Sequence, residues 1–144
     1  IDLSGRLGWK SHMLTYEDTV AEVIEVLTSQ TSNAYKAFLR KLGISYIIAG
    51  EDKLDYEILL SKLRELFNIE MLMLGGGGVL NWSFIQAGFC DELSIVIAPA
   101  ADGSRETQTL FMTKDNLTTD LAKGFKLLEV MPLEGSSVWL RYKV

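Results

Sequence analysis

Four consecutive glycines at positions 75–78 constrain this chain more than any other feature of its sequence. Glycine loses more conformational entropy on folding than any other residue, at about 0.5–1 kcal/mol relative to alanine in regular structure. A run of four therefore indicates a backbone that must turn sharply or that another group must approach closely. The mostly apolar run before them, residues 69–74, predicts a strand buried on both faces. The residues after them predict a short helix over 79–87, closed by Gly88.

Strands and helices alternate along the rest of the chain. Residues 23–28, 44–50 and 91–99 are short runs with the composition of strands. Apolar residues recur at helical spacing between residue 32 and Gly43, and again between Asp55 and Asn68. The runs 125–133 and 136–144 predict a C-terminal antiparallel hairpin. This order predicts one domain over residues 1–144, with an α/β sheet that is mostly parallel at first and has an antiparallel edge.

Composition excludes several classes of protein. The net charge is −5, which argues against a nucleic-acid-binding module, and no apolar run approaches the ~20 residues of a membrane span. Cys90 is the only cysteine, so no disulfide forms within the chain, and we expect a reducing, cytoplasmic compartment. His12 is the only histidine. We therefore expect neither a His-based triad nor a metal site.

The placement of the glycines suggests an anion site. The loop follows the carboxyl end of a predicted buried strand and opens a helix, whose first N–H groups are free and carry partial positive charge. We expect Gly76, Gly77 and Gly78 to bind a diphosphate, helped by the amides of Val79 and Leu80. The Rossmann, P-loop and nucleophile-elbow motifs do not fit this stretch. A tight turn with close helix–strand packing is the alternative, and it explains the same run.

The stretch LMLGGGGVLNWSFIQAGFCDELSIVIAPAADG, residues 72–103, resembles the cofactor loop and following strand of the dihydrofolate-reductase-like family. It is most similar to the pyrimidine reductases of riboflavin biosynthesis, including the C-terminal reductase domain of the bifunctional enzyme. Those proteins carry a glycine loop, a short helix, AGLVDEL and an apolar strand ending in proline. Here the last parts read AGFCDEL and IVIAP, and the start IDLSGRLGW resembles the family's central strand and turn. The resemblance implies a mixed sheet flanked by helices.

The resemblance also implies an activity, namely the NADPH-dependent reduction of a ribosylamino-pyrimidine phosphate. It assigns no catalytic residue. By position, the adenosine half of the cofactor would lie near Asp2, Leu3 and Ser4 at the end of the first strand. The cofactor diphosphate would contact Gly76, Gly77, Gly78, Val79, Leu80 and Asn81. A cis peptide, known in this loop of dihydrofolate reductases, would fall at Gly75–Gly76. Family members commonly pair through sheet edges, which implies a homodimer here.

The chain departs from the family pattern in two ways. The pyrimidine reductases usually have a glutamate that contacts substrate at the position of Gly75, whereas dihydrofolate reductases have glycine there. The family's N-terminal part, which supplies much of the substrate and nicotinamide pocket, has no counterpart before Ile1. Two alternatives therefore stay open. One is a dihydrofolate-reductase-like reductase of another substrate, and the other is a non-catalytic nucleotide-binding or dimer-forming remnant.

Overall fold

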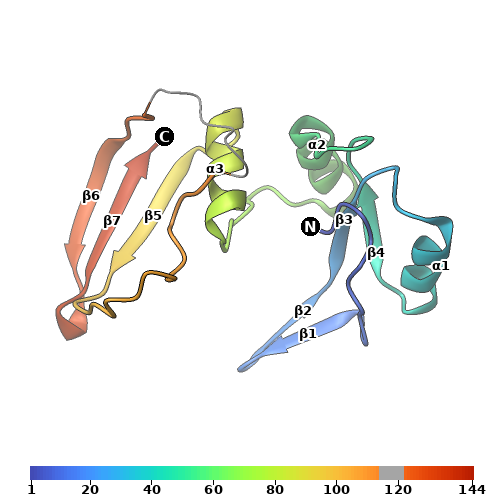
Figure 1. Ribbon diagram of the computed structural model, residues 1–144, viewed down its shortest axis with the longest axis horizontal. Helices are drawn as coiled ribbons and strands as arrows, with labels where there is room; N and C mark the ends of the chain where they lie inside the picture. The colour runs from blue at the N-terminus through green and yellow to red at the C-terminus, as the bar shows by residue number, and fades with distance from the viewer. Residues whose placement is uncertain (114–121) are drawn as a thin grey trace. The chain divides into compact units, whose positions relative to one another are not determined.

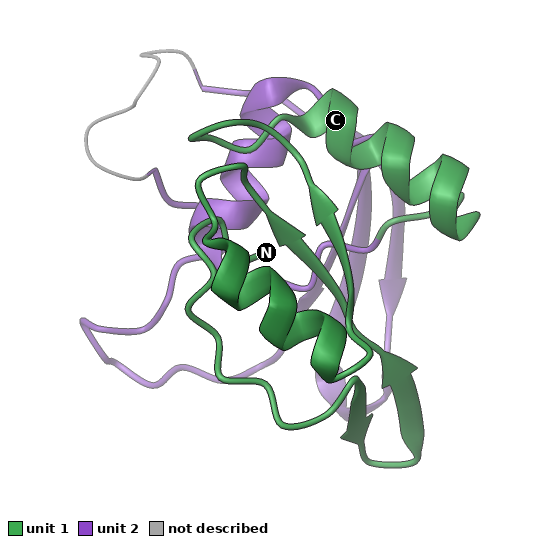
Figure 2. Cartoon of the chain, turned by 90° about the vertical axis from the view of Figure 1, so that its right-hand side faces the viewer, with its two compact units in different colours: residues 1–72 green, residues 73–144 purple. Residues whose placement is uncertain are grey.

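The computed structural model of the chain describes residues 1–113 and 122–144 (Figure 1). Its contacts divide into two compact units, Ile1–Leu72 and Met73–Val144, which Figure 2 colours separately. The boundary falls inside the apolar run that precedes the glycines. Unit 1 and unit 2 below denote these two parts. A single domain over residues 1–144 stays a prediction.

Unit 1 contains a parallel strand pair and two helices. Strand β3 (Ile24–Leu27) pairs with β4 (Ser45–Ile48) in register from Ile24 with Ser45 to Leu27 with Ile48. Helix α1 (Asn33–Lys41) connects the two strands, and α2 (Tyr56–Phe67) follows β4. The strands predicted at residues 23–28 and 44–50 and the two predicted helices are confirmed. The first strand expected to end at residues 2–4 is wrong, because these residues belong to no strand. One core cluster is formed by Val23, Leu27, Leu39 and Ile44.

The helix ends of unit 1 follow short-range capping chemistry. The Asp55 side chain accepts a hydrogen bond from the Ile58 N–H at 2.9 Å, which confirms the predicted start of α2. Helix α2 ends at Asn68, which has φ of 54°, and α1 is followed by Gly43, which has φ of 72°. Both residues occupy the left-handed region in which helices commonly terminate.

A hairpin precedes this core and was not predicted. Strands β1 (Met13–Tyr16) and β2 (Thr19–Glu22) pair antiparallel around Glu17 and Asp18. Glu17 has φ of 52°, a conformation that tight hairpin loops usually assign to Asn or Gly. Its two strands have four residues each, and nearly all of their side chains are exposed. Strands this short that bury no apolar face give only a weak signal in the sequence.

The described residues of unit 2 form the helix α3 (Gly78–Ala87) and a three-stranded antiparallel sheet. Helix α3 ends at Gly88 and leads to β5 (Glu92–Ile97), as predicted. Strands β6 (Lys126–Pro132) and β7 (Val138–Lys143) form the predicted C-terminal hairpin around the single turn η1 (Glu134–Ser136). The strand order is β5-β7-β6, so β6 lies at an edge.

The predicted strand at residues 69–74 is wrong. This stretch belongs to no strand and has no ladder partner within the described ranges. Met71 and Met73 are 88% and 87% exposed. An apolar sequence favours strand conformation, but a strand exists only where a neighbouring backbone supplies its hydrogen bonds. The described strands accordingly form three small sheets and not one continuous sheet.

Candidate functional site

The glycine loop combines one special backbone conformation with open space. Gly76 has φ of 114°, which L-residues with a side chain rarely adopt, so this position requires glycine. A Cβ added at Gly75, Gly76 or Gly77 would meet no heavy atom within 4 Å. The expected cis peptide at Gly75–Gly76 is wrong, because every described peptide bond is trans. The chain makes its turn through the conformation of Gly76 instead.

Helix α3 begins without a side-chain cap. Gly77 is its N-cap residue and has no side chain to offer. The Asn81 backbone N–H donates to the Gly77 carbonyl at 3.1 Å. The three preceding amides, those of Gly78, Val79 and Leu80, have no acceptor within the part of the chain that the structure describes. Free amides at a helix N-terminus, together with the helix dipole, are the elements of an anion site.

Two of the predicted cofactor residues are engaged by a later segment of unit 2. The Asn81 side-chain Nδ2 donates to the Leu110 carbonyl at 3.2 Å, and the Met112 N–H donates to the Gly78 carbonyl at 3.1 Å. Gly78 is buried, and a Cβ there would lie 2.5 Å from the Thr109 carbonyl oxygen. Residues 75–77 are therefore open, whereas residue 78 is covered. Close packing is thus found at Gly78, against residues 109–112, and is not found at the three glycines before it.

The predicted adenosine-side residues lie in unit 1. The Asp2 carboxylate accepts hydrogen bonds from the backbone N–H groups of Gly5, Arg6 and Leu7. Partial burial raises the pKa of Asp2, but these N–H donors outweigh burial and hold it below its ordinary value of 3.8. The carboxylate thus organises its own loop, and the exposed side chains there are those of Ser4, Arg6 and Leu7.

The Leu3 carbonyl ties this loop to the core. It accepts hydrogen bonds from the hydroxyl groups of Thr28 at 2.7 Å and Thr31 at 3.2 Å. Both threonines are buried, so the attachment is shielded from solvent. Residues 2–4 are consequently held in a defined position against the end of β3.

A buried acid that the sequence did not reveal lies beside this loop. Glu25 in β3 is only 2% exposed, and its carboxylate accepts from Trp9 Nε1 at 2.5 Å and from the Tyr35 hydroxyl at 3.1 Å. Burial raises the pKa of Glu25 and, with the nearby carboxylate, raises the pKa of Tyr35 to about 12. The sequence signal was a charged residue inside an otherwise apolar strand, which is rare unless the charge is paired.

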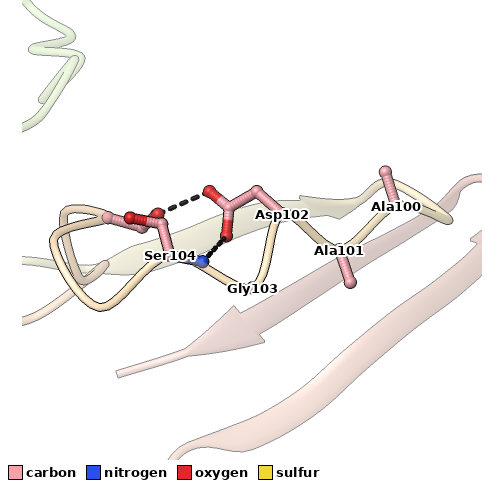
Figure 3. Close-up of a pocket in the computed structure, with 6 residues that line it drawn as sticks. Ala100, Ala101, Asp102, Gly103 and Ser104 are labelled. Atoms are coloured by element: carbon pink, nitrogen blue, oxygen red, sulfur yellow. Dashed lines mark hydrogen bonds between the residues drawn. The ribbon is translucent and has the colours of Figure 1, made fainter.

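Figure 3 shows a hollow in unit 2. None of the residues that line it belongs to the glycine loop. In the hollow, Asp102 accepts hydrogen bonds from the Thr107 hydroxyl and, at 2.9 Å, from the Ser104 N–H. These bonds, that of Thr107 first, lower the pKa of Asp102 and close a local turn. None of the predicted site residues lines the hollow. Its lining residues are all exposed: Ala100, Ala101, Asp102, Gly103, Ser104 and Thr107.

Metal-binding clusters and membrane-spanning helices are both absent from residues 1–113 and 122–144. No group of three or more His, Cys, Asp or Glu side chains is placed to hold a metal ion there. No helix in those ranges has the length and apolar character needed to cross a membrane.

Comparison with known protein families matches residues 3–133 to the family described as the RibD C-terminal domain. A 2,5-diamino-6-ribosylamino-4(3H)-pyrimidinone 5′-phosphate reductase of Methanothermobacter thermautotrophicus is 36% identical over 99 residues, 69% of this chain and 44% of the relative. A protein of the same name from Aquifex aeolicus is 31% identical over 72 residues, 50% of this chain and 32% of the relative. The chain thus spans less than half of these relatives.

Solved structures show the same fold at lower identity. A pyrimidine reductase-like protein from Corynebacterium diphtheriae superposes with a TM-score of 0.66 at 19% identity, covering 84% of this chain and 49% of that one. RibD of Acinetobacter baumannii gives 0.63 at 23% identity, covering 84% and 30%. These likenesses confirm the predicted α/β, dihydrofolate-reductase-like fold.

Proposed function

Since the chain belongs to the RibD C-terminal domain family, we propose that its protein reduces a ribosylamino-pyrimidine phosphate in riboflavin biosynthesis, with NADPH as the reductant. The names of the relatives support a pyrimidine phosphate as substrate. NADPH, when bound, supplies the hydride that converts the substrate's ribose to a ribityl chain. The protein binds and orients the two molecules.

The uncapped N-terminus of α3 carries this proposal. The diphosphate of a dinucleotide is an anion, and the amides of Gly78, Val79 and Leu80 are donors without acceptors in the described structure. The open space at residues 75–77 lets such a group approach the backbone closely. These residues therefore fit the cofactor's charged bridge.

The loop of residues 2–7 would hold the adenosine half. Asp2 and the Leu3 carbonyl fix its backbone, so the exposed side chains of Ser4 and Arg6 are presented from an ordered support. A guanidinium group pairs well with a phosphate. Arg6, or Lys10 further along, would contact the 2′-phosphate that distinguishes NADPH from NADH.

Calorimetric titration of the intact protein tests the proposal directly. We expect saturable binding of NADPH and weaker binding of NADH. Turnover of a ribosylamino-pyrimidine phosphate should follow when both molecules are supplied. Absence of NADPH binding would remove the reductase assignment, and binding without any turnover would favour the non-catalytic alternative.

Gly75 favours a second candidate, a reductase of the same fold with another substrate. A carboxylate that hydrogen-bonds a polar substrate is worth about 1.5–3 kcal/mol, and this chain has none at that position. Gly75 does not have a positive φ, and its Cβ direction is open, so Gly75→Glu is sterically allowed. Improved turnover of the pyrimidine by Gly75→Glu supports the first candidate, whereas unchanged failure to turn it over supports the second.

We also propose that the protein pairs as a homodimer through the edge strand β6. All seven of its residues are exposed, and Leu127 and Val130 are apolar side chains about half exposed. An apolar edge strand invites pairing with another chain. Light scattering of the intact protein should give twice the mass of one chain, and Val130→Lys should shift it toward one.

We place the protein in the cytoplasm. Cys90 is the only cysteine in this sequence, and it forms no disulfide. Burial raises the pKa of the Cys90 thiol. A chain that uses no disulfide is compatible with a reducing compartment. Cell fractionation checks this placement.

A further inference from the structure

We propose that residues 109–112 form a strap that fixes the first turn of α3 and thereby sets its affinity for NADPH. In this arrangement Asn81 is a positioning residue for the strap and not a ligand of the cofactor. This inference rests on the proposed function, in which the glycine loop and the start of α3 bind the cofactor diphosphate.

The strap contacts the first turn of α3 at three points. The Met112 N–H donates to the Gly78 carbonyl at 3.1 Å, and Asn81 Nδ2 donates to the Leu110 carbonyl at 3.2 Å. The Thr109 carbonyl oxygen lies so close to Gly78 that a Cβ would come within 2.5 Å of it. Position 78 thus requires glycine because the strap leaves no room for a side chain, whereas position 76 requires it because of its positive φ.

Aromatic rings connect the strap to the sheet of unit 2. Phe111 lies with its ring centroid 6.4 Å from Trp82 on α3 and 6.2 Å from Phe125. Phe125 in turn lies 6.3 Å from Tyr142 on β7. Tilted ring pairs at these separations are favourable contacts. The strap is therefore linked through Phe125 to β7.

The hydrogen bond to Gly78 has a direct consequence for anion binding. The Gly78 carbonyl and the Val79 N–H belong to one planar peptide unit. Met112 holds the carbonyl end of that unit, and so it fixes the direction in which the free Val79 N–H points. Donors that are oriented before binding lose less entropy when the ligand arrives, which strengthens binding.

Asn81 donates hydrogen bonds both within the helix and to the strap. Its backbone N–H donates to Gly77, and its Nδ2 donates to Leu110 across a sequence separation of 29 residues. Its Oδ1 is buried, with no hydrogen-bond partner in the described structure. The backbone N–H of Asn81 thus serves the helix, and one N–H of its side-chain amide serves the strap.

Asn81→Leu tests the inference, because leucine keeps a similar volume and removes the donor. We expect faster hydrogen exchange at the Met112 amide and about a tenfold rise in the Kd for NADPH, which corresponds to 1.4 kcal/mol. The kcat at saturating NADPH should change less than twofold. Gln86→Leu removes an amide from the last turn of the same helix, where the described structure has no hydrogen bond to the strap, and should leave both readings at wild-type values.

The possible failures are distinguishable. If the wild type does not bind NADPH, the proposed function is wrong and this inference fails with it. If the wild type binds and Asn81→Leu binds equally well, only the strap's role is wrong. Should Asn81→Leu not fold, Phe111→Leu replaces it, since it weakens the strap's contact with Trp82 and should raise the Kd in the same way.

Discussion

Replacing Gly78 with alanine should destabilise the protein although alanine is the better helix former. The added Cβ would stand 2.5 Å from the Thr109 carbonyl oxygen and 3.2 Å from the Met112 nitrogen. Both are backbone atoms that cannot rotate away, so the strap must shift. Overpacking of this kind costs about 1–3 kcal/mol. The gain in helix propensity, up to ~1 kcal/mol, offsets part of it. We expect a net loss of about 1–2 kcal/mol in the free energy of unfolding.

Urea unfolding of the intact protein, followed by tryptophan fluorescence, measures this loss. Trp82 contacts Phe111 in the strap, so its emission reports on the region that the substitution disturbs. Gly75→Ala is the matched control, because a Cβ there meets nothing within 4 Å and no positive φ is involved. It should change the free energy of unfolding by less than ~0.5 kcal/mol. Equal stability of the two variants would refute the packing of the strap on Gly78.

Three further predictions concern unit 1. Asp2→Asn removes a charged acceptor of backbone N–H groups and should cost about 2 kcal/mol at pH 7. Because the folded pKa of Asp2 lies below 3.8, this difference should shrink as pH falls through that folded value, and a constant difference down to pH 2 would contradict it. The raised pKa of Glu25 means that the folded state holds its proton more tightly, so the free energy of unfolding falls as pH rises from 4.5 through the folded pKa. Urea titrations from pH 4 to 8 should show that Glu25→Gln flattens this dependence, and an unchanged slope would exclude Glu25 as its source. Asp55→Ala removes the N-cap of α2 and should lower the free energy of unfolding, measured by thermal melting, by about 1 kcal/mol. Asp52 is exposed, and Asp52→Ala should leave this free energy unchanged.

Short-range chemistry made much of this fold predictable. Asp55 starts α2 by capping an amide three residues away, and Asn68 and Gly88 end helices through their own left-handed conformation. The C-terminal hairpin was predictable because two strand-like runs flank a turn of a few residues. The glycine run marked the N-terminus of α3, since glycine's conformational freedom is local to the residue.

What failed was any feature that depends on a distant backbone. The apolar run 69–74 has the composition of a strand, but composition does not supply the neighbour that completes its hydrogen bonds. Glu25 is paired with Trp9, a residue 16 positions away, and nothing in either residue's neighbourhood announces the partner.

The sequence alone therefore determined where helices begin and end, which runs favour strands, and that glycines open the backbone before α3. Only the tertiary structure decided that Gly78 is covered by residues 109–112 while residues 75–77 stay open, and that Asn81 reaches Leu110. The physical reason is the distance along the chain over which each interaction acts. Capping and backbone conformation are settled within a few residues of chain, whereas burial and long-range hydrogen bonds depend on which segments folding brings together.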